Sequence, residues 1–267
     1  KIEVLAFYDT LTGLPNLDLL RDRTDQALTA SLRNQQHVAL LYMDVDGFKT
    51  LNDSLGHSYG DALLRTLAEV LRGLIRDSDT LCRPGGDEFV ILLPDLDSPE
   101  DAAAIADKIM RHLRQPLAVL GRSISTSLSL GLAVAPGDGS AFETLLRNAE
   151  TAMYKAKQDG RQTWRFFDAA MNDEALEHLT LLNGQRQAID NHELLLHYQP
   201  QIDMRSGALI GVEALVRWQH PELGLLPPGR FIAAAEESRL IVPMGEWILH
   251  QACNQAAAWH RAGLSIA

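Results

Sequence analysis

The sequence predicts an α+β fold, in which helices pack on a sheet that contains an antiparallel hairpin. Short apolar runs of strand length alternate with longer segments whose apolar residues recur at helical spacing. Residues 80–94 form two such runs joined by a glycine turn, as in a hairpin. The chain of 267 residues, with 46% apolar and 22% charged residues, is long enough for one large or two medium domains of a soluble globular protein.

Start and stop signals place the elements along the first 168 residues. Four helices are expected: after the cap residue Asn16, over 59–76, after Ser98 with Pro99, and over 141–157 after a capping box of Ser140 and Glu143. Strands are expected over 38–45, in the hairpin 80–94, over 123–134 and over 164–167.

Two acidic residues follow two glycines at the tip of the expected hairpin, in the order Gly85, Gly86, Asp87, Glu88. Glycine weakens a plain strand and adjacent acids repel, so this order favours a tight turn that presents carboxylates to a cation. An ordinary acidic turn is the alternative.

The buried strand 38–45 also ends in acids, and Asp44 and Asp46 share a face if the strand continues that far. Convergent carboxylates with open positions suit Mg²⁺, which leaves room for substrate phosphates. Helix capping or turn chemistry by these residues is the alternative.

Composition excludes some partners. There are 24 Lys and Arg against 35 Asp and Glu, a net charge of −11, which is a poor match for duplex nucleic acid. No apolar run reaches the length of a membrane span and no signal peptide pattern is present, so we expect a cytoplasmic protein. Because the chain starts with Lys1, an upstream sensor or membrane region is possible. Cys82 and Cys253 are expected to be buried free thiols.

Five separated motifs resemble the GGDEF domain, the diguanylate cyclase family. They are Asp9–Asn16, Asp44–Lys49, Asn52–Asp61, Gly85–Phe89 and Ala152–Arg161. The resemblance implies a cyclase/polymerase palm-like, ferredoxin-related sheet with packed helices. It also implies that two GTP molecules are condensed into cyclic di-GMP and pyrophosphate with Mg²⁺ or Mn²⁺, a reaction that depends on in-line positioning and charge neutralisation.

The resemblance assigns roles around the hairpin. Asp44, Asp87 and the backbone carbonyl near Val45 are implied to bind metal, and Glu88 to help deprotonate the attacking hydroxyl. Gly85 and Gly86 let the backbone approach the nucleotide. Phe48 and Lys49 are expected to begin a loop that meets the β- and γ-phosphates.

Further residues are implied to read the base and the phosphates. Asn52 and Asp61 resemble the guanine readers, although Asp61 is also a first-turn acid favoured by the helix dipole. Lys157 and Arg161 resemble phosphate contacts, although cations are common at helix C-termini.

A short Arg-x-x-Asp motif, Arg76 and Asp79, resembles the inhibitory product site for cyclic di-GMP. A solvated charged turn is the alternative. The sequence departs from the family pattern at Leu17, Pro84 and Glu150, and Pro84 is the one expected to alter the hairpin.

The last part of the chain resembles the start of an EAL domain, the cyclic di-GMP phosphodiesterase family. The matching residues are Tyr198–Pro200, Glu213–Leu215, His220–Pro221, Pro228, Phe231–Ile232 and Ala235–Glu237. Glu213 resembles its first metal ligand, and Gln199 and Arg217 resemble substrate contacts. The resemblance implies a partial (β/α) barrel of TIM type, which stops at Leu264–Ala267, where another strand is expected to begin.

We therefore expect a GGDEF domain over 1–168, a helical linker over 169–192 and the first third of an EAL domain over 193–267. The cyclase is expected to act as a homodimer on GTP, without phosphodiesterase activity in this chain. One rival hypothesis is a silent GTP-binding module that regulates an EAL phosphodiesterase. The other is a parent protein that acts mainly as a phosphodiesterase.

Overall fold

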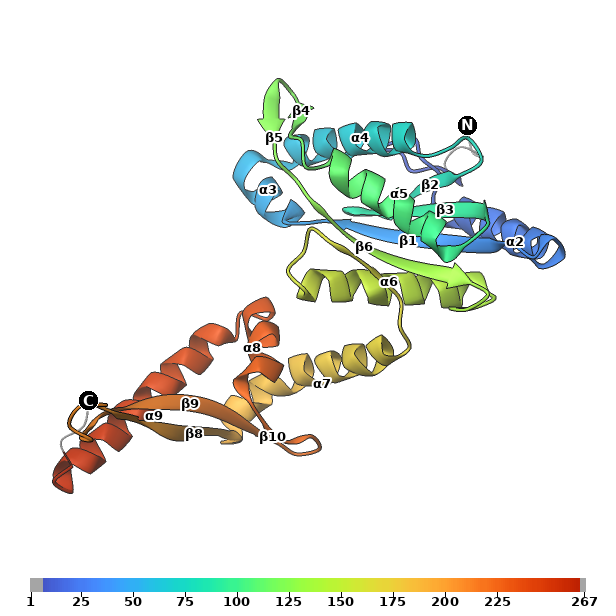
Figure 1. Ribbon diagram of the computed structural model, residues 1–267. Coiled ribbons are helices and arrows are strands. Elements are labelled where there is room, and N and C mark those ends of the chain that lie inside the picture. The colour runs from blue at the N-terminus through green and yellow to red at the C-terminus, as the bar shows by residue number, and fades with distance from the viewer. Residues whose placement is uncertain (1–6, 265–267) are drawn as a thin grey trace. The chain divides into compact units, whose positions relative to one another are not determined.

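The computed structural model describes residues 7–264, except for the side chains at positions 174, 175 and 237, and divides into two compact units (Figure 1). The first unit runs to Asn172 and the second begins at Asp173. Each unit has its own hydrophobic core. The units are therefore described separately. No helix within residues 7–264 has the length and apolar character needed to cross a membrane.

A five-stranded sheet forms the centre of the first unit. Its strands lie in the order β2-β3-β1-β6-β7, with bounds Thr80–Gly85, Glu88–Leu96, His37–Val45, Leu128–Ala135 and Trp164–Phe166. Strand β1 pairs antiparallel with both β3 and β6, and β7 pairs parallel with β6. The α+β architecture predicted from the sequence is confirmed, and β1, the strand that ends in Asp44, is its central strand.

Helices cover both faces of this sheet (Figure 1). Alternate residues of β1 pack on opposite sides: Ala39, Leu41 and Met43 join the core beneath α4 and α5, whereas Val38, Leu40 and Tyr42 join the core beneath α2 and α6. The helices are α2 (Leu17–Asn34), α4 (His57–Leu74), α5 (Pro99–His112) and α6 (Phe142–Gln158). Burial on both faces explains why β1 is an unbroken apolar run.

Two of the predicted helix starts are confirmed and one is wrong. Asn16 caps α2 by accepting from Leu19 N at 3.2 Å, and the capping box at Ser98 is complete. The box predicted at Ser140 does not form, because the helix begins one residue later with Ala141 as its cap residue. Glu143 instead pairs with Arg21 of α2 at 2.5 Å.

Two further expectations are corrected. The strand predicted over 123–134 is interrupted, since Arg122–Ile124 (β5) pairs with Leu117–Val119 (β4) in a separate hairpin before β6 begins. Leu120 and Gly121 supply the positive φ angles, 48° and 75°, of its tight turn. The loop predicted to begin at Phe48 is a helix, α3 (Phe48–Leu55), because Leu51 turns into the core.

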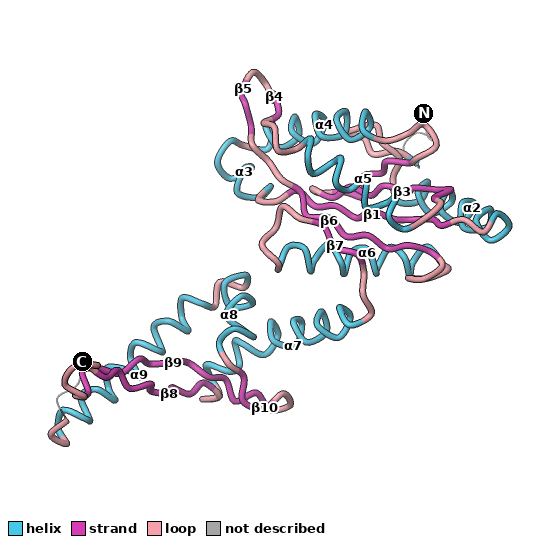
Figure 2. Tube along the Cα trace, viewed as in Figure 1, coloured by secondary structure: helices cyan, strands magenta, loops and turns pink. Residues whose placement is uncertain are grey.

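Within the described residues, the second unit combines a three-stranded sheet with three helices, and Figure 2 shows these elements by type. Its elements are α7 (Ala170–Asp190), β8 (Leu194–Ile202), β9 (Leu209–His220), β10 (Gly224–Leu226), α8 (Pro228–Glu237) and α9 (Ile241–Arg261). The sheet order is β10-β9-β8, and no closed barrel forms within the described residues. The strand expected to begin near Leu264 lies almost entirely outside them.

Helix α7 covers most of the predicted linker, but its later turns belong to the second core. Leu181 and Ala188 are buried there beside Trp218. Gln185 is fully buried, donates to Phe231 O at 2.8 Å and accepts from Ser238 Oγ at 3.2 Å. These bonds fix α7 to α8. The prediction of free thiols is right, but Cys253 is exposed on α9 while Cys82 is buried.

Candidate active site

The acidic residues predicted from the sequence meet at one end of the central sheet. Asp44, near the end of β1, lies directly opposite Glu88, the first residue of β3. The Val45 N–H donates to Asp87 O at 3.2 Å, which fixes the hairpin turn against the same strand end. Directly opposed carboxylates destabilise a strand pair unless a cation balances them. This end of the sheet is therefore a place where positive charge is needed.

Lys157 supplies one such charge from the last turn of α6. Its Nζ lies 2.8 Å from Asp44 Oδ2, and the two side chains are 27% and 13% exposed, so the pair is largely shielded from water. Burial raises the pKa of Asp44 above its ordinary value, against the lowering effect of Lys157 and with a further rise from Asp87 and Glu88. Asp44 is thus paired with one ammonium and lies near two other carboxylates.

Tyr42 holds the second carboxylate, and sequence reasoning did not find it. Its side chain lies on the same face of β1 as Asp44, and its hydroxyl hydrogen-bonds to Glu88. Burial, followed by the charge of Glu88, raises the pKa of Tyr42, so the hydroxyl stays protonated and donates. Because Tyr42 lies two residues before Asp44 in the same strand, strand alternation could have indicated that the two side chains share a face.

Arg83 anchors the glycine turn and was also missed. Its guanidinium donates to Gly86 O and, at 2.8 Å, to Asp9 Oδ1. Asp9 Oδ2 in turn accepts from the N–H and the hydroxyl of Thr12. Arg83 is 8% exposed, so this chain of charge-assisted bonds is largely shielded. This chain of bonds fixes the backbone of the turn relative to the N-terminal motif. The spacing of Asp9 and Thr12 was the feature of the sequence that could have indicated it.

Pro84 lies at an irregularity in the hairpin. The register of β2 against β3 shifts between Cys82 and Gly85. Proline has no N–H to donate to the ladder, which accounts for a bulge at this position. Gly85 and Gly86 then carry positive φ angles of 156° and 53°.

The predicted base-reading residues lie on α3 and α4. Helix α4 begins at His57, two residues earlier than expected, so Asp61 lies beyond its first turn and the expectation of a first-turn acid is wrong. Asn52 packs against Gly60, where a Cβ would come within 2.0 Å of Asn52 Oδ1. That oxygen is buried and has no hydrogen-bond partner among the described residues. Asp61 is exposed one residue after Gly60, and Phe48 and exposed Lys49 begin α3. A buried acceptor without a partner is costly, and a donor from a bound ligand would satisfy it.

Asp46, which alternation placed beside Asp44, has a different environment. Strand β1 ends at Val45, and the Asp46 carboxylate accepts from Ser127 Oγ, Ser129 Oγ and Gln162 N. Gln162 follows Arg161, an exposed residue in the turn after α6. The structure thus brings this turn to the end of β1.

Arg76 and Asp79 form a compact turn after α4. Asp79 Oδ2 accepts from the Arg76 N–H at 2.8 Å, and both residues line a cavity of about 280 Å³. Arg23 and Arg72 line it as well. The carboxylates of Asp77 and Asp79 also line it, so its three guanidinium groups leave a net positive charge of only one.

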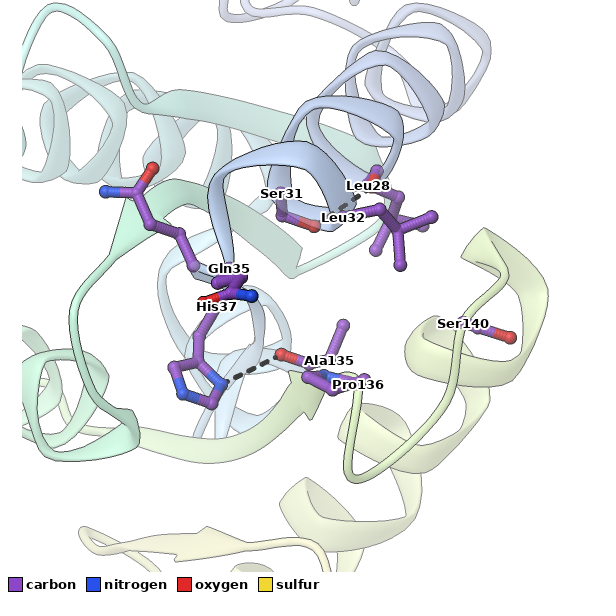
Figure 3. A pocket seen from close by; sticks show the side chains of 9 residues that line it. Leu28, Ser31, Leu32, Gln35, His37, Ala135, Pro136 and Ser140 are labelled. Atoms are coloured by element: carbon purple, nitrogen blue, oxygen red, sulfur yellow. Dashed lines mark hydrogen bonds between the residues drawn. The ribbon is translucent and has the colours of Figure 1, made fainter.

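A second cavity of about 280 Å³ contains none of the predicted site residues (Figure 3). It lies at the opposite end of β1, where Leu28 and Leu32 of α2 face Pro136. His37 Nδ1 lies 3.2 Å from Ala135 O beside it.

The donors at the end of β1 fit Mg²⁺ in kind. Within residues 7–264, no three His, Cys, Asp or Glu side chains are grouped so that they could hold a metal by themselves. Two carboxylates and a backbone carbonyl form a sparse oxygen set, and Mg²⁺ commonly completes such a set with water and substrate phosphates.

In the second unit, the register of β8 against β9 puts three predicted residues on one face of the sheet. Gln199 lies directly opposite Glu213, and Arg217 lies opposite Leu195, which shares a face with Gln199.

Comparison with known proteins places these features in a family. Residues 6–163 match the family described as "Diguanylate cyclase, GGDEF domain". The chain is a member of the GGDEF family. Residues 183–267 match the EAL domain.

The GGDEF relatives include longer proteins and a solved domain. The chain is 46% identical over 259 residues to the bifunctional diguanylate cyclase/cyclic di-GMP phosphodiesterase MucR of Pseudomonas aeruginosa, covering 97% of this chain and 38% of MucR. It is 40% identical over 266 residues to the cyclic di-GMP phosphodiesterase PdeR of Escherichia coli, covering 100% of this chain and 40% of PdeR. The chain therefore spans well under half the length of these relatives.

A solved GGDEF domain matches part of this chain. The structure of an N-terminally shortened mutant of TpbB (also called YfiN) from Pseudomonas aeruginosa, which comprises only the GGDEF domain, superposes with a TM-score of 0.61 at 38% identity, covering 62% of this chain and 97% of that one. The palm-like sheet implied by the sequence motifs is thereby confirmed.

Proposed function

We propose that residues 1–168 form a diguanylate cyclase domain that condenses two GTP molecules into cyclic di-GMP and pyrophosphate. The observation that carries the proposal is the cluster of Asp44, Asp87 and Glu88 at one strand end, balanced by Lys157. Phosphoryl transfer needs cations at a fixed place to neutralise developing charge, and this cluster would hold them.

Asp44, Asp87 and the Val45 carbonyl would hold Mg²⁺ or Mn²⁺, which when bound neutralises phosphate charge. Glu88, fixed by Tyr42, would accept the proton of the attacking 3′-hydroxyl. Lys157, Arg161 and Lys49 would contact phosphates, together with the N–H groups at the start of α3, where Phe48 lies. Gly85 and Gly86 would leave space for the nucleotide beside the turn that Arg83 anchors.

Asn52 and Asp61 would select guanine. Asp61 would accept from N1–H and the exocyclic amine, and Asn52 Oδ1 would gain the donor that it lacks. Adenine would leave such acceptors unpaired at about 1–3 kcal/mol each, so GTP should be preferred over ATP.

The cavity at Arg76 and Asp79 would bind cyclic di-GMP as an inhibitor, with the other arginines of the cavity adding charge. The product has two-fold symmetry, so two GTP-loaded domains would face each other in a homodimer. We place this chemistry in the cytoplasm, where GTP is available.

The test is to incubate the purified chain with GTP and Mg²⁺ and to resolve the nucleotides by chromatography. Cyclic di-GMP should form, and Asp87→Asn should abolish it while the circular dichroism spectrum is unchanged. Bound GTP without product in the dimeric protein would overturn the cyclase proposal. Arg76→Ala should relieve inhibition by added cyclic di-GMP, and an unchanged inhibition curve would remove the product site.

A second candidate function is a silent GTP-binding module that regulates an EAL phosphodiesterase. It is favoured by PdeR, a relative named for phosphodiesterase activity alone. In that case Gln199, Glu213 and Arg217, on one face of β8 and β9, would contribute to the site that hydrolyses cyclic di-GMP in the longer protein. The same GTP incubation separates the two candidates.

A further inference from the structure

Asp46 accepts three hydrogen bonds from two other segments of the first unit. Ser129 Oγ donates to Oδ1 at 2.7 Å, and Ser127 Oγ donates to Oδ2 at 2.6 Å. Gln162 N also donates to Oδ2, at 3.2 Å. In addition, Asp46 N donates to Ser127 O at 3.0 Å. The residue thus connects the end of β1 to the start of β6 and to the turn after α6.

These bonds leave little of the carboxylate for a metal. An ionised carboxylate offers about four acceptor positions, and protein donors occupy three of them. Ser129 is fully buried, so its hydroxyl depends on an internal acceptor. Asp44, by contrast, keeps its carboxylate among other acids and Lys157. Two carboxylates only two residues apart therefore have different roles.

The turn held by Asp46 has an unfavourable backbone. Arg161 and Gln162 are consecutive non-glycine residues with positive φ angles of 61° and 48°. L-residues rarely adopt this region, so surrounding bonds must hold them in it. Arg161 N donates to Ala156 O at 3.1 Å, and Gln162 N donates to Asp46. The backbone is thus fixed on both sides of the Arg161 side chain.

We propose that Asp46 is a positioning residue that holds the turn of Arg161 beside the metal-binding end of β1, so that the guanidinium can meet a nucleotide phosphate. This inference rests on the proposed function through the phosphate contact of Arg161. It extends that function by assigning Asp46 to the phosphate side of the site rather than to the metal.

The test compares wild type, Asp46→Ala, Arg161→Ala and the double variant, with Asp25→Ala as a control for loss of an exposed acid. Calorimetry with the non-reactive analogue guanosine 5′-(α,β-methylene)triphosphate and Mg²⁺ gives nucleotide affinity. Each single variant should weaken binding about tenfold, as expected for loss of one charge-assisted contact. The double variant should be no weaker than Arg161→Ala, because both changes remove the same interaction. Asp25→Ala should bind like wild type.

Two further measurements do not depend on GTP binding. Hydrogen exchange at the Gln162 amide should be faster in Asp46→Ala than in wild type, and Mn²⁺ affinity without nucleotide, followed by electron paramagnetic resonance, should be unchanged. If Asp46→Ala fails to fold, Asp46→Asn replaces it, since its amide cannot accept from all three donors.

The possible failures are distinguishable. Multiplying losses in the double variant, or loss of Mn²⁺ binding in Asp46→Ala, would overturn the positioning role. Unchanged exchange at Gln162 would also overturn it, whatever the protein binds. A wild-type chain that binds no GTP analogue would overturn the proposed function, and the phosphate role of Asp46 with it.

Discussion

Lys157 Nζ lies 2.8 Å from Asp44 Oδ2, so an ammonium at the end of α6 is paired with the acid at the end of β1. The pair joins the two elements that carry most of the proposed site. The ammonium also offsets part of the negative charge of Asp44, Asp87 and Glu88. Removing it would leave the carboxylate of Asp44 uncompensated in a place that is shielded from water.

Lys157→Met should lower the free energy of unfolding at pH 7 by about 2–3 kcal/mol. The pKa of Asp44 is already raised in the folded protein. Its contribution to stability is therefore full below the ordinary value of 3.8 and is lost as pH rises through the folded pKa. Without Lys157 the pKa of Asp44 in the folded protein rises further. The loss of unfolding free energy caused by Lys157→Met should therefore shrink as the pH is lowered toward 4. Urea unfolding at pH 7 and pH 4 measures it.

The matched control is Lys155→Met on the same helix. Lys155 Nζ lies 3.9 Å from Asp159 Oδ1 in an i,i+4 pair with both side chains 30% exposed, which is worth about 0.5 kcal/mol or less. Mg²⁺ should raise the unfolding temperature of Lys157→Met more than that of wild type, because a bound cation relieves the uncompensated carboxylates. Equal losses in the two lysine variants would contradict this account of the site.

The pair of Asp9 and Arg83 should give stability the opposite dependence on pH. Burial acts to raise the pKa of Asp9, but hydrogen bonds from Thr12 and Arg83 outweigh it, and the pKa is lowered. The contribution of Asp9 is therefore present above 3.8 and is lost as pH falls through the folded pKa. Asp9→Asn should cost about 2 kcal/mol at pH 7, and the gap to wild type should narrow below pH 4.

Urea titrations between pH 2 and pH 7 check this prediction, with exposed Asp25→Asn as the control. A gap that stays constant down to pH 2 would show that the ionised Asp9 does not stabilise the turn through Arg83.

Local patterns were sufficient to predict much of the fold. The apolar run of β1 and the caps at Asn16 and Ser98 are determined by neighbouring residues, and the structure has them where expected. The capping box predicted at Ser140 was wrong because α6 begins one residue later, and Glu143 pairs with Arg21, a partner 122 positions away along the chain. Helix α3 was missed because eight residues leave too little periodicity to separate a helix from a loop.

In the candidate site, too, local patterns predicted some features, and contacts between distant residues determined the others. Strand alternation and the acidic hairpin bring Asp44 and Glu88 together, as the pattern indicated. Strand alternation also grouped Asp46 with Asp44, because the alternation pattern does not show that β1 ends at Val45, one residue before Asp46. Arg83 and Tyr42 were missed because their partners, Asp9 and Glu88, are distant in sequence and become neighbours only through tertiary contacts.

Tyr42→Phe removes only the hydroxyl that bonds to Glu88, and it should slow cyclic di-GMP formation several-fold with little change in stability. The reason is that Glu88 loses the donor that fixes its orientation, and misplacement of a proton acceptor reduces its contribution to the rate. Initial rates at saturating GTP measure the effect. Tyr198→Phe in the second unit is the control and should match wild type; a Tyr42→Phe rate equal to that of wild type would exclude Tyr42 from positioning Glu88.

Gly131→Ala should be among the most damaging single-methyl changes in the chain. Gly131 lies on β6 beneath α6, and a Cβ there would lie 2.0 Å from Ala149 O and 2.1 Å from Met153 N. Both atoms belong to the helix backbone, so the whole of α6, including Lys157, must shift. We expect the free energy of unfolding to fall by about 3 kcal/mol and the Mg²⁺-dependent rise in unfolding temperature to change. Gly73→Ala, at an exposed position of α4 with no atom within 4 Å of the new Cβ, should instead stabilise the protein by about 0.5–1 kcal/mol. Urea unfolding of the two variants decides the matter, and a Gly131→Ala protein as stable as wild type would mean that α6 does not pack against β6 this closely.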